Sequence, residues 1–241
     1  MRSTIQRLLA LIGAMSVLTF AAPPAGAATL HIDQLLIAPA RSAAGSAGGG
    51  GGPAPCADPA YRKIGGAWQN TYAWSFQSSS TPRGLNKTSV RNVLKRSFSN
   101  ITGARNDCGM PDTVSATHIF LGATTSRARC DQRDQRNVVG FRPLELGVLA
   151  VTCFWMSNGR MLEADVQINS NESWALSMNS CQDEAMLEAT MTHEAGHVFG
   201  LDHVGERKHG RLTMSPFLDG PCNNGEATLG EGDVLGLSEL Y

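Results

Sequence analysis

The sequence has no excess of charge of either sign and, beyond its first residues, no long apolar run. Its 20 Lys and Arg residues are balanced by 21 Asp and Glu residues, which gives a formal net charge of −1. Without a basic field, nucleic acid is not an expected partner. The glycines at 48–52 are not followed by Lys-Ser or Lys-Thr, which excludes a phosphate-binding loop. No internal repeat is present, so repeat architectures are excluded as well.

The N-terminus is typical of a secretory signal. Arg2 and Arg7 precede an apolar stretch at 8–22, and Ala25-Gly26-Ala27 fits the small-x-small pattern of a cleavage site. The alternative is a membrane anchor, but the stretch is short for a span and two prolines follow it. We therefore predict a signal peptide at 1–27, a secreted, extracellular protein, and no membrane association after cleavage.

The rest of the 241 residues fits one folded domain with a short leading segment. Residues 28–55 are rich in Gly and Ala and are interpreted as a linker or a short pro-segment, and 56–241 as the domain. Hydrophobic periodicity predicts strands and helices in alternation, hence an α/β (α+β) fold. The expected strands are 71–76, 117–122, 147–155 and 162–168, and the expected helices are 86–100, 183–199 (capped by Ser180 or Asp183) and 233–240.

Six cysteines suit an exported protein, and an even number indicates three disulfides. The sequence alone does not choose among the possible pairings. Our hypothesis pairs Cys181 with Cys222, because these residues flank the 183–199 helix and the segment that follows it. The remaining pairs would then be Cys130–Cys153 and Cys56–Cys108.

One motif, H-E-x-x-H-x-x-G-x-x-H, spans residues 193–203. His193 and His197 are spaced to share one face of a helix, with Glu194 beside them. Gly200 can adopt the left-handed conformation that ends a helix and turns the chain. That turn would bring in His203 as a third nitrogen ligand, which leaves the fourth tetrahedral position of one zinc ion open for water.

The longer motif resembles that of the metzincins, a zinc endopeptidase superfamily. Leu212-Thr213-Met214-Ser215-Pro216 is similar to its Met-turn, with Met214 as the structural methionine. The C-terminal run 229–241 and the E-A-D-V-Q-I-N segment at 163–169 resemble the matrixin branch, of the bacterial secreted type. The resemblance implies a mixed twisted sheet, an active-site helix and a small loop-rich C-terminal subdomain that contains the Met-turn and a final helix.

The resemblance also implies residue roles. His193, His197 and His203 would bind the zinc ion, and Glu194 would be the general base. The strand at 159–169 would be the sheet edge along which a peptide substrate adds. Asp165 and Asp202 are candidates for carboxylates that hydrogen-bond to a zinc ligand or bind calcium. The His and Asp series that binds structural zinc and calcium in vertebrate matrixins is not recognisable.

A second segment resembles a different matrixin feature. Cys108-Gly109-Met110-Pro111-Asp112 is similar to the cysteine switch, in which a free thiolate blocks the zinc. The segment follows the first predicted helix, whereas a switch would precede the first strand. An even number of cysteines also favours a bridged Cys108.

These observations predict a secreted, monomeric, zinc-dependent endopeptidase that acts on proteins or peptides. One alternative is a zinc amidase that cuts cell-wall peptides by the same chemistry. The other is a secreted, non-catalytic metal-binding module, which the adjacent Glu194 disfavours because a structural zinc needs no base.

Overall fold

A computed structural model describes residues 28–37 and 51–241. The predicted signal at 1–27 and residues 38–50 of the predicted linker lie outside the described residues. The main sheet has seven strands in the order β11-β1-β6-β7-β5-β3-β4. Its strands are β1 (Thr29–Ile37), β3 (Tyr72–Phe76), β4 (His118–Ala123), β5 (Val138–Arg142), β6 (Val148–Ser157), β7 (Arg160–Asn169) and β11 (Phe217–Leu218).

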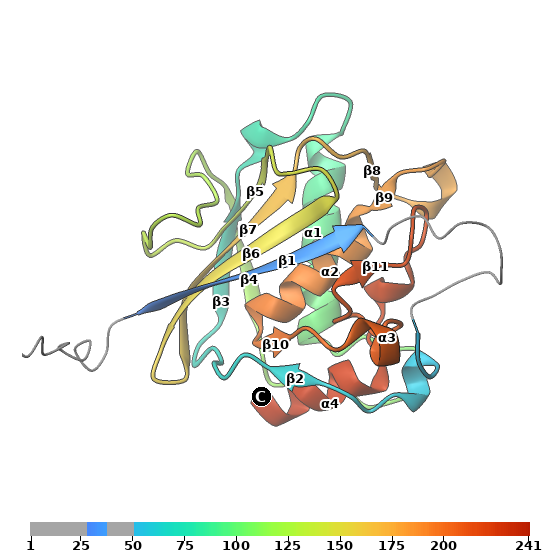
Figure 1. Cartoon of the computed structure of the whole chain (residues 1–241). Helices are drawn as coiled ribbons and strands as arrows, with labels where there is room; N and C mark the ends of the chain where they lie inside the picture. The colour runs from blue at the N-terminus through green and yellow to red at the C-terminus, as the bar shows by residue number, and fades with distance from the viewer. Residues whose placement is uncertain (1–27, 38–50) are drawn as a thin grey trace, which may run out of the picture.

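Two long helices, α1 (Lys87–Thr102) and α2 (Leu187–Val198), cover one face of this mixed sheet (Figure 1). The side chain of Asn86 caps α1 by accepting a hydrogen bond from the Ser89 N–H. The apolar stripe of α1 is buried, as its helical spacing predicts. Every residue of α2 is buried, because the sheet, α1 and the C-terminal part of the chain surround this helix.

The C-terminal part lies beneath α2 and contains α3 (Glu206–His209) and α4 (Glu231–Leu240) (Figure 1). Two small ladders complete the fold, one between β2 (Arg62–Lys63) and β10 (Leu201–Asp202), the other between β8 (Trp174–Ala175) and β9 (Ala185–Met186). The mixed sheet, central helix and loop-rich C-terminal part agree with the predicted metzincin-like fold.

All three predicted disulfides are confirmed. Cys181 bonds to Cys222, Cys130 to Cys153 and Cys56 to Cys108. The first of these ties the segment before α2 to the segment that follows the Met-turn. Because Cys108 is bridged, it has no free thiol with which to act as a switch.

Two predictions are wrong, one about where a helix begins and one about where a strand lies in the sheet. The helix that carries the motif begins at Leu187 rather than near residue 183, because Cys181 is bridged and β9 pairs with β8 immediately before the helix. The strand at 160–169 is not a sheet edge: β7 lies between β5 and β6 and pairs with both. Beyond β6 the sheet continues with β1, which the sequence analysis did not predict.

Candidate metal centre

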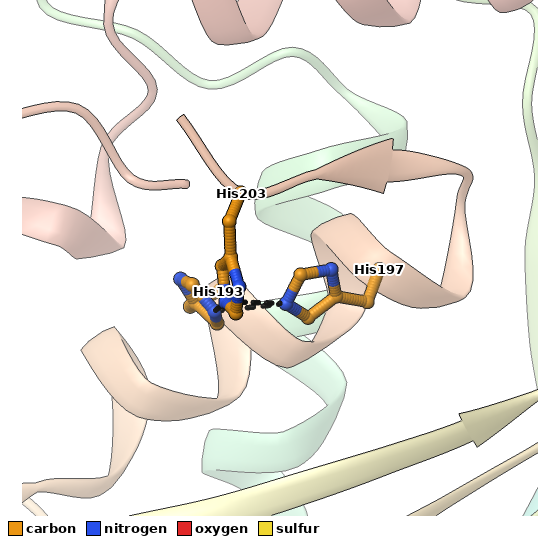
Figure 2. Close-up of side chains that lie close together, drawn as sticks. All are labelled: His193, His197 and His203. Atoms are coloured by element: carbon orange, nitrogen blue, oxygen red, sulfur yellow. Dashed lines mark hydrogen bonds between the residues drawn. The ribbon is translucent and has the colours of Figure 1, made fainter. Parts of the chain in front are cut away.

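Three histidine rings meet at the C-terminal end of α2. His193 and His197 lie one turn apart on the helix, and His203 enters from the segment after β10 (Figure 2). The three Nε2 atoms lie 3.0–3.1 Å from one another. Tetrahedral zinc with bonds of about 2.0–2.1 Å separates its nitrogen ligands by roughly 3.3 Å. The three side chains therefore fit such an ion with a displacement of a few tenths of an ångström.

Backbone carbonyls fix two of the rings in a metal-binding tautomer. The Nδ1 atom of His193 lies 2.7 Å from the Thr213 carbonyl oxygen, and that of His197 lies 3.0 Å from the Leu201 carbonyl oxygen. An Nδ1–H that donates to a carbonyl leaves the Nε2 lone pair free for a metal. Thr213 belongs to the Met-turn, so this turn orients a histidine as well as supporting the helix.

Burial keeps the three rings neutral. It lowers the pKa of His193 well below its ordinary value and lowers the pKa of both His197 and His203 to about 4. Neutral imidazole is the form that binds zinc. Among the described His, Cys, Asp and Glu side chains, no fourth one completes this histidine group. An open position of this kind is typical of catalytic rather than structural zinc.

We expect the metal-free protein to be sensitive to mild acid. A histidine whose pKa is lowered on folding stabilises the fold above its unfolded pKa of about 6.5, and that contribution is lost as the pH falls toward the folded value. For His197, with a folded pKa of about 4, lowering the pH from 7 to 5 should reduce the free energy of unfolding by about 2 kcal/mol.

Urea unfolding of the metal-free protein at the two pH values measures this change. The zinc-loaded protein, whose histidines are held neutral by the metal, serves as the control at pH 7 and 6. An unfolding free energy that is the same at pH 7 and 5 in the metal-free protein would contradict the expectation.

Glu194 follows His193 on α2 and is fully buried. One of its carboxylate oxygens accepts a hydrogen bond from the hydroxyl of Thr152 on β6. Thr152 is also fully buried, so this contact ties the carboxylate of α2 to the sheet. Thr152 was not predicted from the sequence, because a threonine inside an apolar strand carries no local signal of such a contact.

The turn after α2 has the predicted conformation. Gly200 has φ +94°, and its carbonyl accepts a hydrogen bond from the Ile64 N–H at 2.9 Å. A Cβ atom at this position would lie 2.4 Å from the carbonyl oxygen of Gly66. The turn that delivers His203 thus needs glycine for two reasons, its backbone conformation and its close approach to a neighbouring chain segment.

Gly200→Ala should therefore lower the free energy of unfolding by roughly 2–4 kcal/mol, from backbone strain plus the displacement of Gly66. Thermal and urea unfolding measure the loss. Gly84→Ala is a matched control, since Gly84 has a similar φ of +92° with no atom near the added Cβ. Equal losses in the two variants would show that the approach to Gly66 contributes nothing.

Met214 packs against the histidine-bearing turn of α2. It is buried, and a Cβ atom at Gly196 would come within 2.3 Å of its sulfur. The missing side chain of Gly196 thus makes room for Met214 against the turn of α2 that carries His197. This packing agrees with the structural role expected of the Met-turn.

Comparison with known proteins agrees with this geometry. The family model for matrixins matches residues 123–241, which include α2, the third histidine, the Met-turn and α4. This match supports a matrixin-like metalloprotease. It is also similar to a putative matrix metalloproteinase of Spodoptera frugiperda ascovirus 1a, with 28% identity over 92 residues. That match covers 36% of this chain and only 23% of the viral protein.

The other candidate carboxylates of the chain have defined partners. Asp165 is buried and accepts hydrogen bonds from the backbone N–H groups of Arg129 and Val138. Its neighbour Glu163 accepts from the N–H of Asp134. Both acids therefore organise the loop between β4 and β5. Asp202 forms an ion pair with Arg62 at 3.2 Å beside the third histidine.

Proposed function

We propose that this chain is a secreted endopeptidase that depends on one zinc ion held by His193, His197 and His203. The observation that carries the proposal is the convergence of three neutral imidazoles beside a buried carboxylate on the same helical turn. No fourth His, Cys, Asp or Glu side chain among the described residues completes this group. The match to matrixins supports a protein or peptide as substrate.

Glu194 is the proposed general base. Zinc, when bound, lowers the pKa of a coordinated water to about 7 and polarises the scissile carbonyl. Glu194 takes the proton of the attacking water and passes it to the leaving amine. The hydroxyl of Thr152 holds the carboxylate in place. The carbonyls of Thr213 and Leu201 keep two of the rings oriented.

Two features support export. The three disulfides fit an oxidising, extracellular compartment, and the sequence of residues 1–27 fits a signal peptide. In the part of the chain that the structure describes, no helix has the length and apolar character needed to span a membrane.

The test is cleavage of a denatured protein by the purified chain, with a zinc chelator and after zinc is restored. We expect hydrolysis to disappear with the chelator and to return with zinc. Hydrolysis that survives complete zinc removal would contradict the proposal. So would a folded, zinc-loaded protein that cleaves no denatured protein.

A further inference from the structure

A cleft lined by arginines lies on the face of the sheet that the helices leave uncovered. It has a volume of about 790 Å³ and is formed by the loop between β4 and β5, with one residue each from β5 and β7. The β7 residue, Gln167, lies between Val166 and Ile168, which pack in the core beneath the helices. Because successive side chains of a strand point to opposite faces, Gln167 points away from α1 and α2. In Figure 1 the yellow-green loop before β5 stands at the left, apart from α2.

The cleft carries an excess of positive charge. Four arginines and two aspartates line it, which leaves two positive charges: Arg127, Arg129, Arg136, Arg142, Asp131 and Asp134. Among the described residues, the guanidinium of Arg129 is the one member of this group that meets a carboxylate, donating to Asp131 at 3.1 and 3.3 Å. A concave surface with protein walls concentrates the field of its charges, so the cleft attracts anions more strongly than a flat surface of equal charge.

The other three guanidiniums keep hydrogen-bond donors unfilled. Arg136 donates to the hydroxyl of Ser126 at 2.6 Å. Within the part of the chain that the structure describes, the side chains of Arg127 and Arg142 have no hydrogen-bond or ion-pair partner. A guanidinium presents five N–H donors in a planar fork, which fits a carboxylate through two parallel hydrogen bonds. The cleft therefore offers several sites for acidic groups.

The loop that carries these arginines is fixed on the side that faces the sheet. Cys130 is bonded to Cys153 of β6. The buried carboxylate of Asp165 accepts the backbone N–H of Arg129 at 2.6 Å and that of Val138 at 2.7 Å. The middle and the end of the loop are thus held in place. Side chains on a fixed loop lose less conformational entropy on binding than those on a flexible one.

The size and the mixed lining of the cleft favour a polypeptide over an inorganic anion or a densely charged polymer. A volume of about 790 Å³ lies in the range of about 300–1,000 Å³ that is typical of sites for organic ligands. Asp131 and Asp134 repel a polymer that carries sulfate or phosphate on every unit. The hydroxyls of Thr125 and Ser126 and the side-chain carbonyl of Gln167 can hydrogen-bond to backbone amides.

We propose that this cleft binds an acidic segment of a protein substrate, whose carboxylates pair with Arg127 and Arg142 at a distance from the bond that is cleaved. The identification of the segment as substrate rests on the proposed function, whereas the binding itself does not. A substrate held at two places binds more tightly than at either alone, because the second contact forms at a high effective concentration. The chain should therefore cleave acidic proteins at lower concentrations than neutral ones.

Fluorescence anisotropy of a labelled peptide of six glutamates tests the binding. The zinc-loaded full chain carries Glu194→Gln in this assay, so that the probe is not consumed. Arg127→Gln/Arg142→Gln should raise the Kd for the probe by at least about tenfold, because it removes two charge-assisted pairs. Arg83→Gln/Arg160→Gln is the matched control, since it removes the same charge at exposed positions outside the cleft. It should change the Kd by less than about twofold at physiological salt, where distant charges are screened.

The control also separates the cleft from the metal centre, whose open position can itself bind a carboxylate. Circular dichroism establishes that both double variants are folded. Equal Kd values in the two double variants would overturn the proposal, as would the absence of binding to the chain with all its arginines. A labelled sulfated hexasaccharide that binds more tightly than the glutamate peptide, and loses this affinity in Arg127→Gln/Arg142→Gln, would overturn the choice of a polypeptide as the partner.

Hydrolysis by the chain with Glu194 intact links the cleft to the choice of substrate. A denatured protein is compared with the same protein extended by a tail of six glutamates. The tail should lower KM by about tenfold without changing kcat, and Arg127→Gln/Arg142→Gln should abolish this advantage while cleaving the untailed protein normally. Equal KM values with and without the tail would overturn the role in substrate binding. If the glutamate peptide binds through the two arginines and no protein is cleaved, the binding site stands and the proposed function fails.

Discussion

Glu194→Gln is expected to keep its zinc and to lose hydrolysis by about 10³-fold or more, because the amide cannot accept the proton of the attacking water. The substitution preserves the size of a side chain that is fully buried. The amide oxygen can still accept the hydrogen bond from Thr152. The loss should therefore fall on kcat rather than on stability or metal content. Steady-state cleavage and zinc analysis of the same sample measure both quantities.

Thr152→Val is a second variant, which tests the orientation of Glu194 rather than its chemistry. Valine keeps the shape of threonine but cannot donate to Glu194, so the base remains and its orientation is lost. Loss of a supporting contact of this kind typically costs about 10–100-fold in activity. A Glu194→Gln variant that retains zinc and cleaves as fast as the unaltered chain would refute the assignment of the base. An effect of Thr152→Val as large as that of Glu194→Gln would mean that the threonine does more than orient it.

The site was more predictable than its surroundings because its signals are local. The spacing of His193 and His197 on one helix, and the need for a turn at Gly200, are both contained in eleven residues. The disulfide hypothesis is also confirmed, and it rested on local order: Cys181 leads into the helix that carries the motif, and Cys222 follows the Met-turn.

The errors come from pairing between distant segments. The 160–169 strand alternates as a half-exposed strand would, yet β5 and β6 pair with its two sides. β1 was missed because its composition shifts at once into a Gly- and Ala-rich segment, and because its partner β6 lies more than a hundred residues away. Thr152 illustrates the same point, since its partner Glu194 is 42 residues further along the chain.

A second large effect is expected at Asp233, whose carboxylate is hydrogen-bonded to the backbone of the Met-turn. This buried carboxylate accepts backbone hydrogen bonds from Thr213 at 3.0 Å, Met214 at 3.3 Å and Gly230 at 2.9 Å. The carbonyl of Thr213 in turn accepts from the Nδ1–H of His193. A carboxylate on α4 is thus linked to the first proposed zinc ligand through a single residue of the turn.

Asp233→Asn keeps the shape but has only one acceptor oxygen, so at least one of the three N–H groups loses its partner and meets an amide N–H₂ group. A buried donor without a partner costs about 1–3 kcal/mol, and disturbed support of a metal ligand costs about 10–100-fold in affinity. We expect both losses, measured by urea unfolding and by competition with a zinc chelator.

Glu231→Gln is the matched control in the first turn of the same helix, where the described structure gives the side chain no hydrogen-bond partner. It should change neither quantity, because Glu231 is only partly buried and a substitution away from packed or hydrogen-bonded features usually alters stability by less than about 0.5 kcal/mol. Reduced stability with unchanged zinc affinity in Asp233→Asn would show that the Met-turn supports the fold without orienting His193.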